Sequence, residues 1–170
     1  MLEKIKQRKK TIILILLVLL LGGVVAYKFI DNQPREIIGG SYLPDEKDAK
    51  KMSKEERKKA NEKEVDESKF TLSIYPEATF KNGEAIGAIY IRNEVENAYP
   101  IAVEIVEDKT GDVIYNSGAI QPGYEITEGK LSKNLAKGNY ICTANVSIYD
   151  QKTKKYKGQT AAEIQIEVEE

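Results

Sequence analysis

Few side chains in this sequence have the chemistry that catalysis needs. The 170 residues include no His and a single Cys, Cys142. A Ser, Thr or Cys nucleophile requires an adjacent base, and without His that base has to be a Lys or a carboxylate. Cys142 lies on the apolar side of an alternating stretch, where a thiol usually fills the core. We therefore predict no catalytic residue and no enzymatic activity.

Carboxylates offer no clearer site. Asp108 and Asp112 flank Thr110-Gly111, but a calcium loop needs several more oxygen ligands at fixed spacing, so this segment is predicted to be a hairpin turn. The remaining acids are scattered, and no pair is identifiable as an acid and base for glycoside hydrolysis. We predict no metal, no cofactor and no small-molecule substrate.

The charges are segregated along the chain. Residues 1–10 hold five Lys or Arg and one Glu, whereas residues 70–170 hold 15 acidic and 10 basic residues, a net charge of −5. A nucleic-acid-binding domain carries a basic patch. The acidic balance of residues 70–170 therefore predicts no nucleic-acid partner.

An apolar segment follows the basic N-terminal residues. Residues 11–27 contain no charged side chain, and the segment extends to residue 30 if Lys28 directs its ammonium group to the membrane interface. We predict a transmembrane helix at 11–30. Because Lys and Arg are concentrated before it, residues 1–10 are predicted to be cytoplasmic and the C-terminal part extracellular, in a single-pass cell-membrane protein.

A cleaved signal peptide is the alternative interpretation of the same residues. The basic N-terminal part precedes an apolar stretch at 12–21, and Val24-Val25-Ala26 is an acceptable cleavage site. Cleavage there would release a secreted protein that begins at Tyr27. The anchor is favoured because the apolar run continues through Gly22-Gly23.

Residues 31–69 are predicted to be a juxtamembrane segment and a charged stalk. Eighteen of residues 45–69 are charged, nine of each sign. Ser53 and Glu56 have the spacing of a capping box, so a short helix is predicted from Lys54. The helix has no apolar stripe, which favours a solvated spacer.

From residue 70 the apolar residues alternate with polar ones, the pattern of half-buried strands. The clearest case is 140–149, where Tyr140, Cys142 and Ala144 share one face. Turn residues such as Asn82-Gly83 and Gln121-Pro122-Gly123 separate the strands. The pattern predicts an all-β domain at 70–170, a sandwich of seven or eight strands near 70–75, 78–81, 85–92, 99–107, 112–116, 123–131, 139–149 and 160–169.

Tyrosine is abundant, with ten residues in the chain. Tyr75, Tyr99 and Tyr149 are placed on the outer side of strands or at their ends. Tyr is a frequent anchor of protein interfaces, although an outward Tyr is also an ordinary cross-strand partner. These three residues are the interface candidates that the sequence offers.

The segment from Leu131 to Cys142 resembles the entry into strand F of immunoglobulin-like domains. Its Gly138-Asn-Tyr140-Ile-Cys142 run is similar to the Gly-x-Tyr-x-Cys pattern of that strand. The resemblance implies a structural tyrosine corner, in which the Tyr140 hydroxyl bonds to the backbone upstream. The chain lacks the partner cysteine and the strand-C tryptophan of antibodies, so the likeness is to the broader immunoglobulin and fibronectin type III class.

A longer part of the chain, from about residue 40 onward, resembles uncharacterised single-pass membrane proteins of Gram-positive bacteria. The stretches that carry the likeness are residues 66–74, 99–105, 110–118 and 135–140. The resemblance implies a cell-surface location and no catalytic residues.

These observations predict a non-catalytic, membrane-tethered binding or scaffolding module at the cell surface. Its partner is expected to be another surface protein or a cell-wall component. The alternatives are a structural accessory subunit of a cell-envelope assembly and, if the apolar segment is a cleaved signal peptide, a secreted binding domain.

Overall fold

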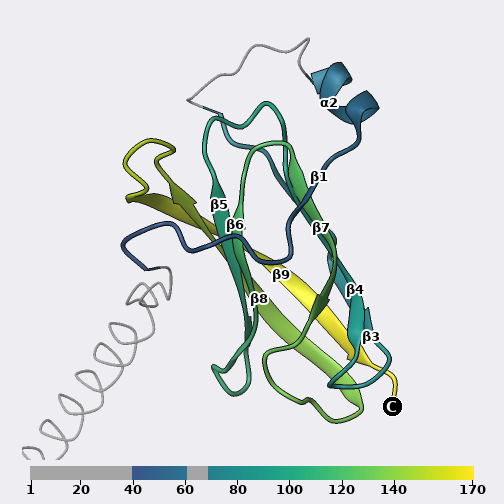
Figure 1. Ribbon diagram of the computed structural model, residues 1–170. Coiled ribbons are helices and arrows are strands. Elements are labelled where there is room, and N and C mark those ends of the chain that lie inside the picture. The colour runs from purple at the N-terminus through teal and green to yellow at the C-terminus, as the bar shows by residue number, and fades with distance from the viewer. Residues whose placement is uncertain (1–39, 61–68) are drawn as a thin grey trace, which may run out of the picture. The chain divides into compact units, whose positions relative to one another are not determined.

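The computed structural model of the chain describes residues 40–60 and 69–170 (Figure 1). The predicted cytoplasmic end (1–10) and transmembrane segment (11–30) lie outside these residues. Among those described, no helix combines the length and the apolar character needed to cross a bilayer. Strands dominate the described part, so the predicted all-β class is confirmed.

Eight strands occupy the part of the chain where alternation predicts them. They are preceded by a two-residue strand, β1 (Lys50–Lys51), and a short helix, α2 (Lys54–Ala60). The eight strands are β2 (Leu72–Ile74), β3 (Glu77–Phe80), β4 (Ile86–Asn93), β5 (Ile101–Glu107), β6 (Val113–Ile120), β7 (Tyr124–Lys130), β8 (Gly138–Tyr149) and β9 (Tyr156–Val168).

The strands form one curled, mixed sheet. Its order is β1-β7-β4-β3-β9-β8-β5-β6, with β2 pairing β4 beside β3. All described strand pairs are antiparallel except β3 with β9, which run parallel from Glu77 opposite Gln165 to Phe80 opposite Val168. Strand β3 therefore joins a β7-β4 half of the sheet to a β9-β8-β5-β6 half (Figure 1).

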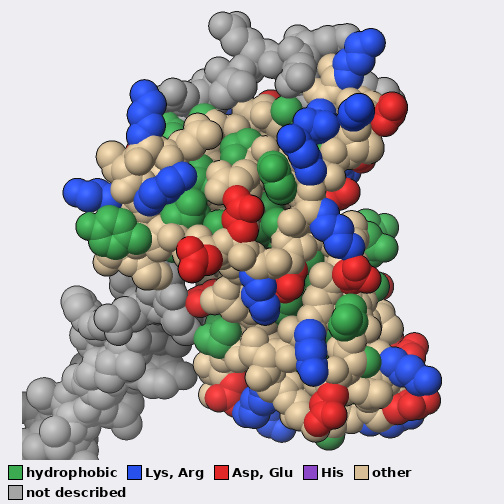
Figure 2. All heavy atoms as spheres, in the orientation of Figure 1, with side chains coloured by type: hydrophobic (Ala, Val, Ile, Leu, Met, Phe, Trp, Pro, Cys, Tyr) green, Lys and Arg blue, Asp and Glu red, His purple; other side chains and the backbone are tan. Residues whose placement is uncertain are grey.

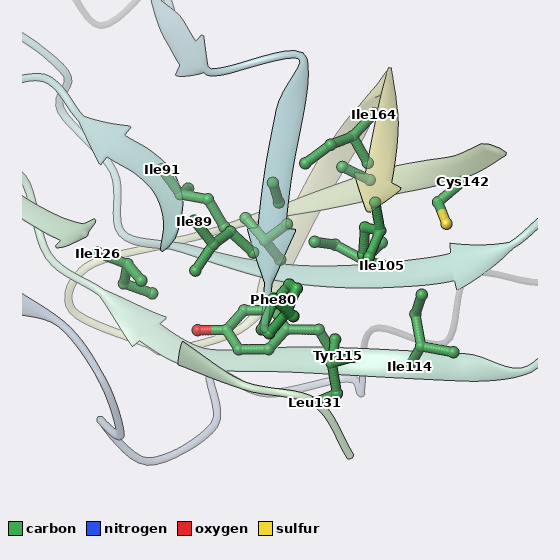
Figure 3. Close-up of a cluster of buried hydrophobic side chains, with 14 of the residues drawn as sticks. Phe80, Ile89, Ile91, Ile105, Ile114, Tyr115, Ile126, Leu131, Cys142 and Ile164 are labelled. Atoms are coloured by element: carbon green, nitrogen blue, oxygen red, sulfur yellow. The ribbon is translucent and has the colours of Figure 1, made fainter. Parts of the chain in front are cut away.

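The inward side chains of both halves share one hydrophobic core. Figure 3 shows Phe80 and Tyr115 at its centre, with Ile89, Ile91 and Ile126 from β4 and β7 on one side and residues of the other half opposite. Phe80 and Tyr115 are fully buried, and burial of one such side chain contributes about 1.5–3 kcal/mol. The core therefore holds the two halves of the curled sheet together.

Strands β6 and β7 stand near opposite ends of the strand order, and no ladder of the described sheet pairs them; side chains make contact between them instead. The Tyr115 ring of β6 lies against Gly129 of β7, where an added Cβ would come within 2.7 Å of the ring. At the same end of β6, the Ser132 amide donates to the carbonyl of Ile114, the residue before Tyr115, at 2.8 Å. This region, the β6–β7 seam, depends on Gly129 because no larger residue leaves room for the aromatic ring.

Residues 41–52, here called the strap, cover part of this seam. The Tyr156 amide donates to the Ser41 carbonyl and the Ala119 amide to the Asp45 carbonyl, both at 3.0 Å. Farther along, β1 pairs with the start of β7, with Lys50 opposite Glu125. The strap thus bonds to β9, β6 and β7 in turn, so the folded part includes residues that the sequence assigns to the juxtamembrane segment and stalk.

The predicted capping box is present at the start of α2. The Glu56 amide donates to Ser53 Oγ at 3.2 Å, and the Ser53 amide donates to Glu56 Oε2 at 3.3 Å. Glu56 also accepts a hydrogen bond from Arg92 of β4 at 2.8 Å. The helix is therefore in contact with the sheet through an ion pair, although it lacks an apolar stripe.

Two buried amides connect the loop after β4 to its surroundings. Asn93 Nδ2 donates to the Ile120 carbonyl at 2.8 Å, and Asn97 exchanges hydrogen bonds with the Thr71 backbone. Asn97 Nδ2 also donates to Asn93 Oδ1 at 2.8 Å. The network satisfies polar groups that would otherwise be costly to bury, and it joins the β2, β4 and β6 ends.

Candidate interaction surface

From Ile86 to Ile91, strand β4 is apolar on both of its faces. Gly87, Ile89 and Ile91 point inward and are buried, as a strand facing a core requires. The alternate residues Ile86 and Tyr90 point outward and are nevertheless large and hydrophobic. The outward face of β4 is therefore apolar and exposed to water, although the inward face already packs in the core.

The outward residues form a surface that we call the Tyr75 patch, consisting of Tyr75, Ile86 and Tyr90. Their exposed fractions are 65%, 66% and 46%. The Tyr75 amide continues the β2–β4 ladder by donating to the Tyr90 carbonyl at 3.0 Å, and the two rings lie 5.9 Å apart between centroids at a tilt of 59°. This tilted pairing holds two amphipathic rings side by side at the surface.

Charged residues border the patch on its β7 side. Lys130 lies opposite Ile86 and Glu128 opposite Ala88 in the β4–β7 ladder. Glu128 is paired with Lys50 at 2.5 Å, and this contact lowers the pKa of the Glu128 carboxyl. An apolar centre with a polar border is the arrangement typical of protein interfaces.

Charges elsewhere on the visible surface are mixed. Figure 2 shows Lys and Arg side chains interspersed with Asp and Glu over most of the face, with several basic residues near α2. On β4, Arg92 is enclosed by Glu56 at 2.8 Å and Glu125 at 3.2 Å. The positive charge of Arg92 is therefore balanced by neighbouring acids.

Of the three tyrosines predicted from the sequence, Tyr75 belongs to the patch and Tyr99 lies elsewhere. Tyr99 is half-buried before β5, and the Lys157 ammonium lies 4.4 Å from the centroid of its ring. This cation–π contact gives Tyr99 a role within the chain. The structure therefore does not bring Tyr99 to the Tyr75 patch.

The prediction that Tyr149 lies on the outer side of its strand as an interface residue is wrong, because the side chain is only 1% exposed. The ladder shifts register between Ile148 and Tyr149, which places Tyr149 opposite Tyr156. The two rings meet edge to face at 6.1 Å, and burial raises the pKa of the Tyr149 hydroxyl. The Tyr156 backbone also bonds to the strap, so this corner is enclosed by segments distant in sequence.

The structural residues predicted on β8 lie together at its start. Gly138 opens the strand, and the Tyr140 hydroxyl donates to the Ala136 carbonyl at 2.7 Å. This is the hydrogen bond expected of a tyrosine corner. It connects β8 to the chain segment that enters it.

Cys142 lies in the core with no exposed surface. Burial, followed by the charges of Asp108 and Glu107, raises the pKa of the Cys142 thiol to about 12. A thiol with this pKa is protonated at neutral pH, whereas nucleophiles and metal ligands are thiolates. Over residues 40–60 and 69–170, no three His, Cys, Asp or Glu side chains are grouped closely enough to hold a metal ion.

Sequence reasoning identified Tyr75 but missed Ile86 and Tyr90. Both lie inside the predicted strand at 85–92, where Ile86, Ala88 and Tyr90 alternate with Gly87, Ile89 and Ile91. A half-buried strand normally has one polar face. Two apolar faces on one strand were therefore the signal that could have located the patch.

Comparison of the chain with protein-family models, with curated proteins and with solved structures finds no match.

Proposed function

We propose that the chain is a non-catalytic, membrane-tethered cell-surface module whose all-β domain binds or scaffolds another surface protein or a cell-wall component through the Tyr75 patch. The observation that carries the proposal is the exposed ring pair of Tyr75 and Tyr90, with the exposed Ile86 on the same face of β4. Large amphipathic aromatic residues dominate the binding energy of many interfaces. Their presence on a face that the core does not need favours binding over catalysis.

The proposed finer fold is an immunoglobulin-like sandwich of the fibronectin type III class. In support, one half of the sheet pairs β4 with β7 and the other runs β9-β8-β5-β6. The first two of the eight strands, β2 and β3, are divided between the two halves. Strand β2 pairs with β4, whereas β3 runs parallel to β9. The tyrosine-corner bond of Tyr140 agrees with this class.

The proposed location is the cell membrane, with the predicted segment 11–30 as anchor, residues 1–10 cytoplasmic and the β domain outside. Because the strap begins at residue 41, residues 31–40 remain as the tether. Ten residues at full extension span no more than about 35 Å. The domain would therefore work close to the membrane of the Gram-positive cell that the sequence resemblance implies.

Site-specific photo-crosslinking in the native host tests the proposed binding face. A photoreactive phenylalanine at position 75 or 90 of the full chain is expected to give the same discrete adduct. The variant Tyr75→Ser/Tyr90→Ser, with the crosslinker at Ile86, should lower the adduct yield roughly 30-fold, the effect of removing about 2 kcal/mol of binding energy.

Ile141 provides the matched control because it is 60% exposed but lies on β8. A crosslinker at Ile141 should not capture that adduct. Since both tyrosines are exposed, the double variant should change the free energy of unfolding by no more than about 1 kcal/mol. Equal capture from positions 75 and 141, or unchanged capture by the serine variant, would show that the Tyr75 patch is not the binding face.

The anchor and the cleaved signal peptide predict different masses for the mature protein. An intact mass equal to the full chain in the membrane fraction, with a domain removed by protease treatment of whole cells, supports the tethered module. A product beginning at Tyr27 would instead make the chain a secreted binding domain.

A structural accessory subunit of a cell-envelope assembly is the second candidate. The specific observation in its favour is the part of β9 before Gln165, which among the described strands pairs only with β8. Exposed strand edges accept strands from neighbouring proteins. Co-purification with partners at fixed stoichiometry in detergent would favour this role over a transient binder.

A further inference from the structure

One edge of β9 is bonded to the strap at Tyr156, whose amide donates to the Ser41 carbonyl, and to β3 from Gln165 onward; between these two points no other described strand covers it. Strand β9 pairs with β8 along its length, but its parallel pairing with β3 begins only at Gln165. Strand β2, which precedes β3, pairs with β4 instead. In Figure 1, the olive part of β9 accordingly lies away from β3 and β4.

The backbone direction identifies the unpaired groups on this edge. The Gln165 amide donates to the Pro76 carbonyl and the Glu169 amide to the Phe80 carbonyl, both on the β3 side. Because the direction of backbone polar groups repeats every two residues along a strand, Gln159, Ala161 and Glu163 present theirs on the same side. Over this stretch, the described residues provide no strand to accept them.

Nothing in the local sequence blocks this edge. Residues 158–162 are Gly-Gln-Thr-Ala-Ala, without a charge, a proline or a bulky side chain. Gln159, Thr160 and Ala161 are exposed, and a Cβ added at Gly158 would meet no atom within 4 Å. Exposed edges are ordinarily protected by lysines, prolines or bulges, and here the register shift beside Lys157 lies only at the end of the edge.

We propose that this edge pairs antiparallel with the same edge of a second copy of the chain, around a two-fold axis at Thr160. In this register Gln159 lies opposite Ala161 of the other copy and Thr160 lies opposite itself. Gln159 and Ala161 exchange backbone hydrogen bonds in both directions. The Thr160 pair is a close, non-hydrogen-bonded pair, and Thr–Thr contacts are favourable across strands.

The charges at the ends of the edge select the second copy and its direction. The uncharged stretch is bounded by Lys157 and Glu163. Antiparallel pairing at Thr160 brings Lys157 opposite Glu163 of the other copy, whereas parallel pairing would align like charges. A shift of the axis to Ala161 would place Lys157 and Glu163 opposite glutamines, and a shift to Gln159 would place Lys157 opposite Ala161.

The interface is small, so the dimer is expected to be weak in dilute solution. The Lys157 ammonium already lies over the Tyr99 ring, a contact of similar strength to a surface ion pair. The charges therefore determine direction more than affinity. If the chain is tethered as proposed, confinement to the membrane raises the effective concentration and favours the pair.

Disulfide crosslinking of the full chain in membranes tests the proposed register. In a non-hydrogen-bonded antiparallel pair the Cα atoms are about 4.5 Å apart, within the range that a disulfide bridges. Thr160→Cys should therefore form a covalent dimer on mild oxidation. Gln159→Cys and Thr153→Cys, which place an exposed thiol off the axis, should crosslink roughly tenfold less.

Backbone and charge variants distinguish strand pairing from chance collision. Ala161→Pro in the Thr160→Cys chain removes a donor from the free edge but no bond to β8, so it should lower crosslinking roughly tenfold while the domain stays folded. Lys157→Glu alone should weaken crosslinking, and adding Glu163→Lys should restore it. The native Cys142 is buried and should not react.

The proposal is overturned if Thr160→Cys crosslinks no better than Thr153→Cys, or if Ala161→Pro has no effect on a folded chain. Adducts of Thr160→Cys with a different protein in place of a second copy would also overturn it. The Tyr75→Ser/Tyr90→Ser variant is expected to crosslink normally at position 160, which separates this proposal from the binding face.

Discussion

Glu104 is a carboxylate whose burial opposes its ionisation. It lies on the outer side of β5 between Asn116 of β6 and Asn145 of β8, and Asn116 Nδ2 donates to it at 2.8 Å. Burial raises the pKa of the Glu104 carboxyl, and the hydrogen bond from Asn116 only partly offsets this effect. The neighbouring Tyr149 hydroxyl is uncharged at neutral pH.

We predict that Glu104→Gln stabilises the domain at pH 7. A carboxyl whose folded pKa exceeds its ordinary 4.5 binds protons more tightly in the folded state, so stability falls as pH rises from 4.5 through the folded pKa. The glutamine side chain keeps an oxygen that accepts the hydrogen bond from Asn116. It does not ionise, so no charge is buried at pH 7. The midpoint of urea unfolding should therefore rise at pH 7, and the gain should shrink toward pH 4.

Glu128→Gln is the control, because the pKa of Glu128 is shifted in the opposite direction to that of Glu104. Lys50 lowers the pKa of Glu128, so any contribution of this exposed pair is present above the ordinary pKa and lost on acidification. The variant should show no gain at pH 7. A Glu104→Gln midpoint that does not exceed that of the native chain at pH 7 would contradict the assigned role of burial.

At the scale of elements, the strap packs against a bulge in β6. The β5–β6 register shifts between Ala102 and Glu104, and Ser117 Oγ accepts the Val103 amide at 2.8 Å in the irregular stretch. Gly118 follows with a φ of 65°. A Cβ at Gly118 would lie 2.5 Å from the Asp45 carbonyl oxygen, so only glycine lets the strap approach this closely.

We predict that Gly118→Ala destabilises the domain by about 2 kcal/mol. The left-handed backbone conformation alone costs about 1–2 kcal/mol for a residue with a Cβ, and displacement of the strap adds to it. Hydrogen exchange should show faster exchange of the Ala119 amide, which bonds to Asp45. Urea unfolding measures the loss of stability.

Gly158→Ala is the matched substitution because its added Cβ meets no neighbour. It should cause no loss, and a gain of up to about 1 kcal/mol is expected from the reduced freedom of the unfolded chain. Equal effects of the two substitutions would mean that contact between the strap and Gly118 does not contribute to stability.

At the scale of the whole molecule, the strap covers the β6–β7 seam, where no ladder of the described sheet pairs the two strands. Met52 is 2% exposed, and Asp48 accepts a hydrogen bond from the buried Tyr115 at 3.1 Å. Burial of the phenol and the negative charge of Asp48 raise the pKa of Tyr115. The strap therefore contributes both apolar burial and a partner for a polar group in the β6–β7 seam.

We predict that a chain covering residues 40–170 is more stable than one covering 70–170. Loss of Met52 burial and of the Tyr115 hydrogen bond should lower the free energy of unfolding by about 3 kcal/mol. Urea unfolding of the two chains, with Met52→Ala in the longer one as an intermediate case, measures the difference. Equal midpoints would show that the strap only lies on the surface of an independently stable sheet.

The sequence by itself determined the features that depend on neighbouring residues. Alternation located the strands, Pro122-Gly123 marked a turn, and Ser53 and Glu56 indicated the capping box. The resemblance of Gly138-Asn-Tyr140 to strand F indicated a hydrogen bond from the Tyr140 hydroxyl to the backbone upstream. Each depends on side-chain periodicity or on hydrogen bonds over a few residues, so the local pattern was sufficient.

Only the tertiary structure decided the features that join distant segments. The parallel β3–β9 pair, the contact of the strap with Gly118 and the burial of Tyr149 involve residues separated by about 70 positions or more, or depend on a register shift between strands. A local pattern specifies which face of a strand is apolar but not which strand or segment covers it. The charged composition of residues 45–69 accordingly indicated a spacer, although residues 45–52 bond to the sheet through their backbone, which composition does not reveal.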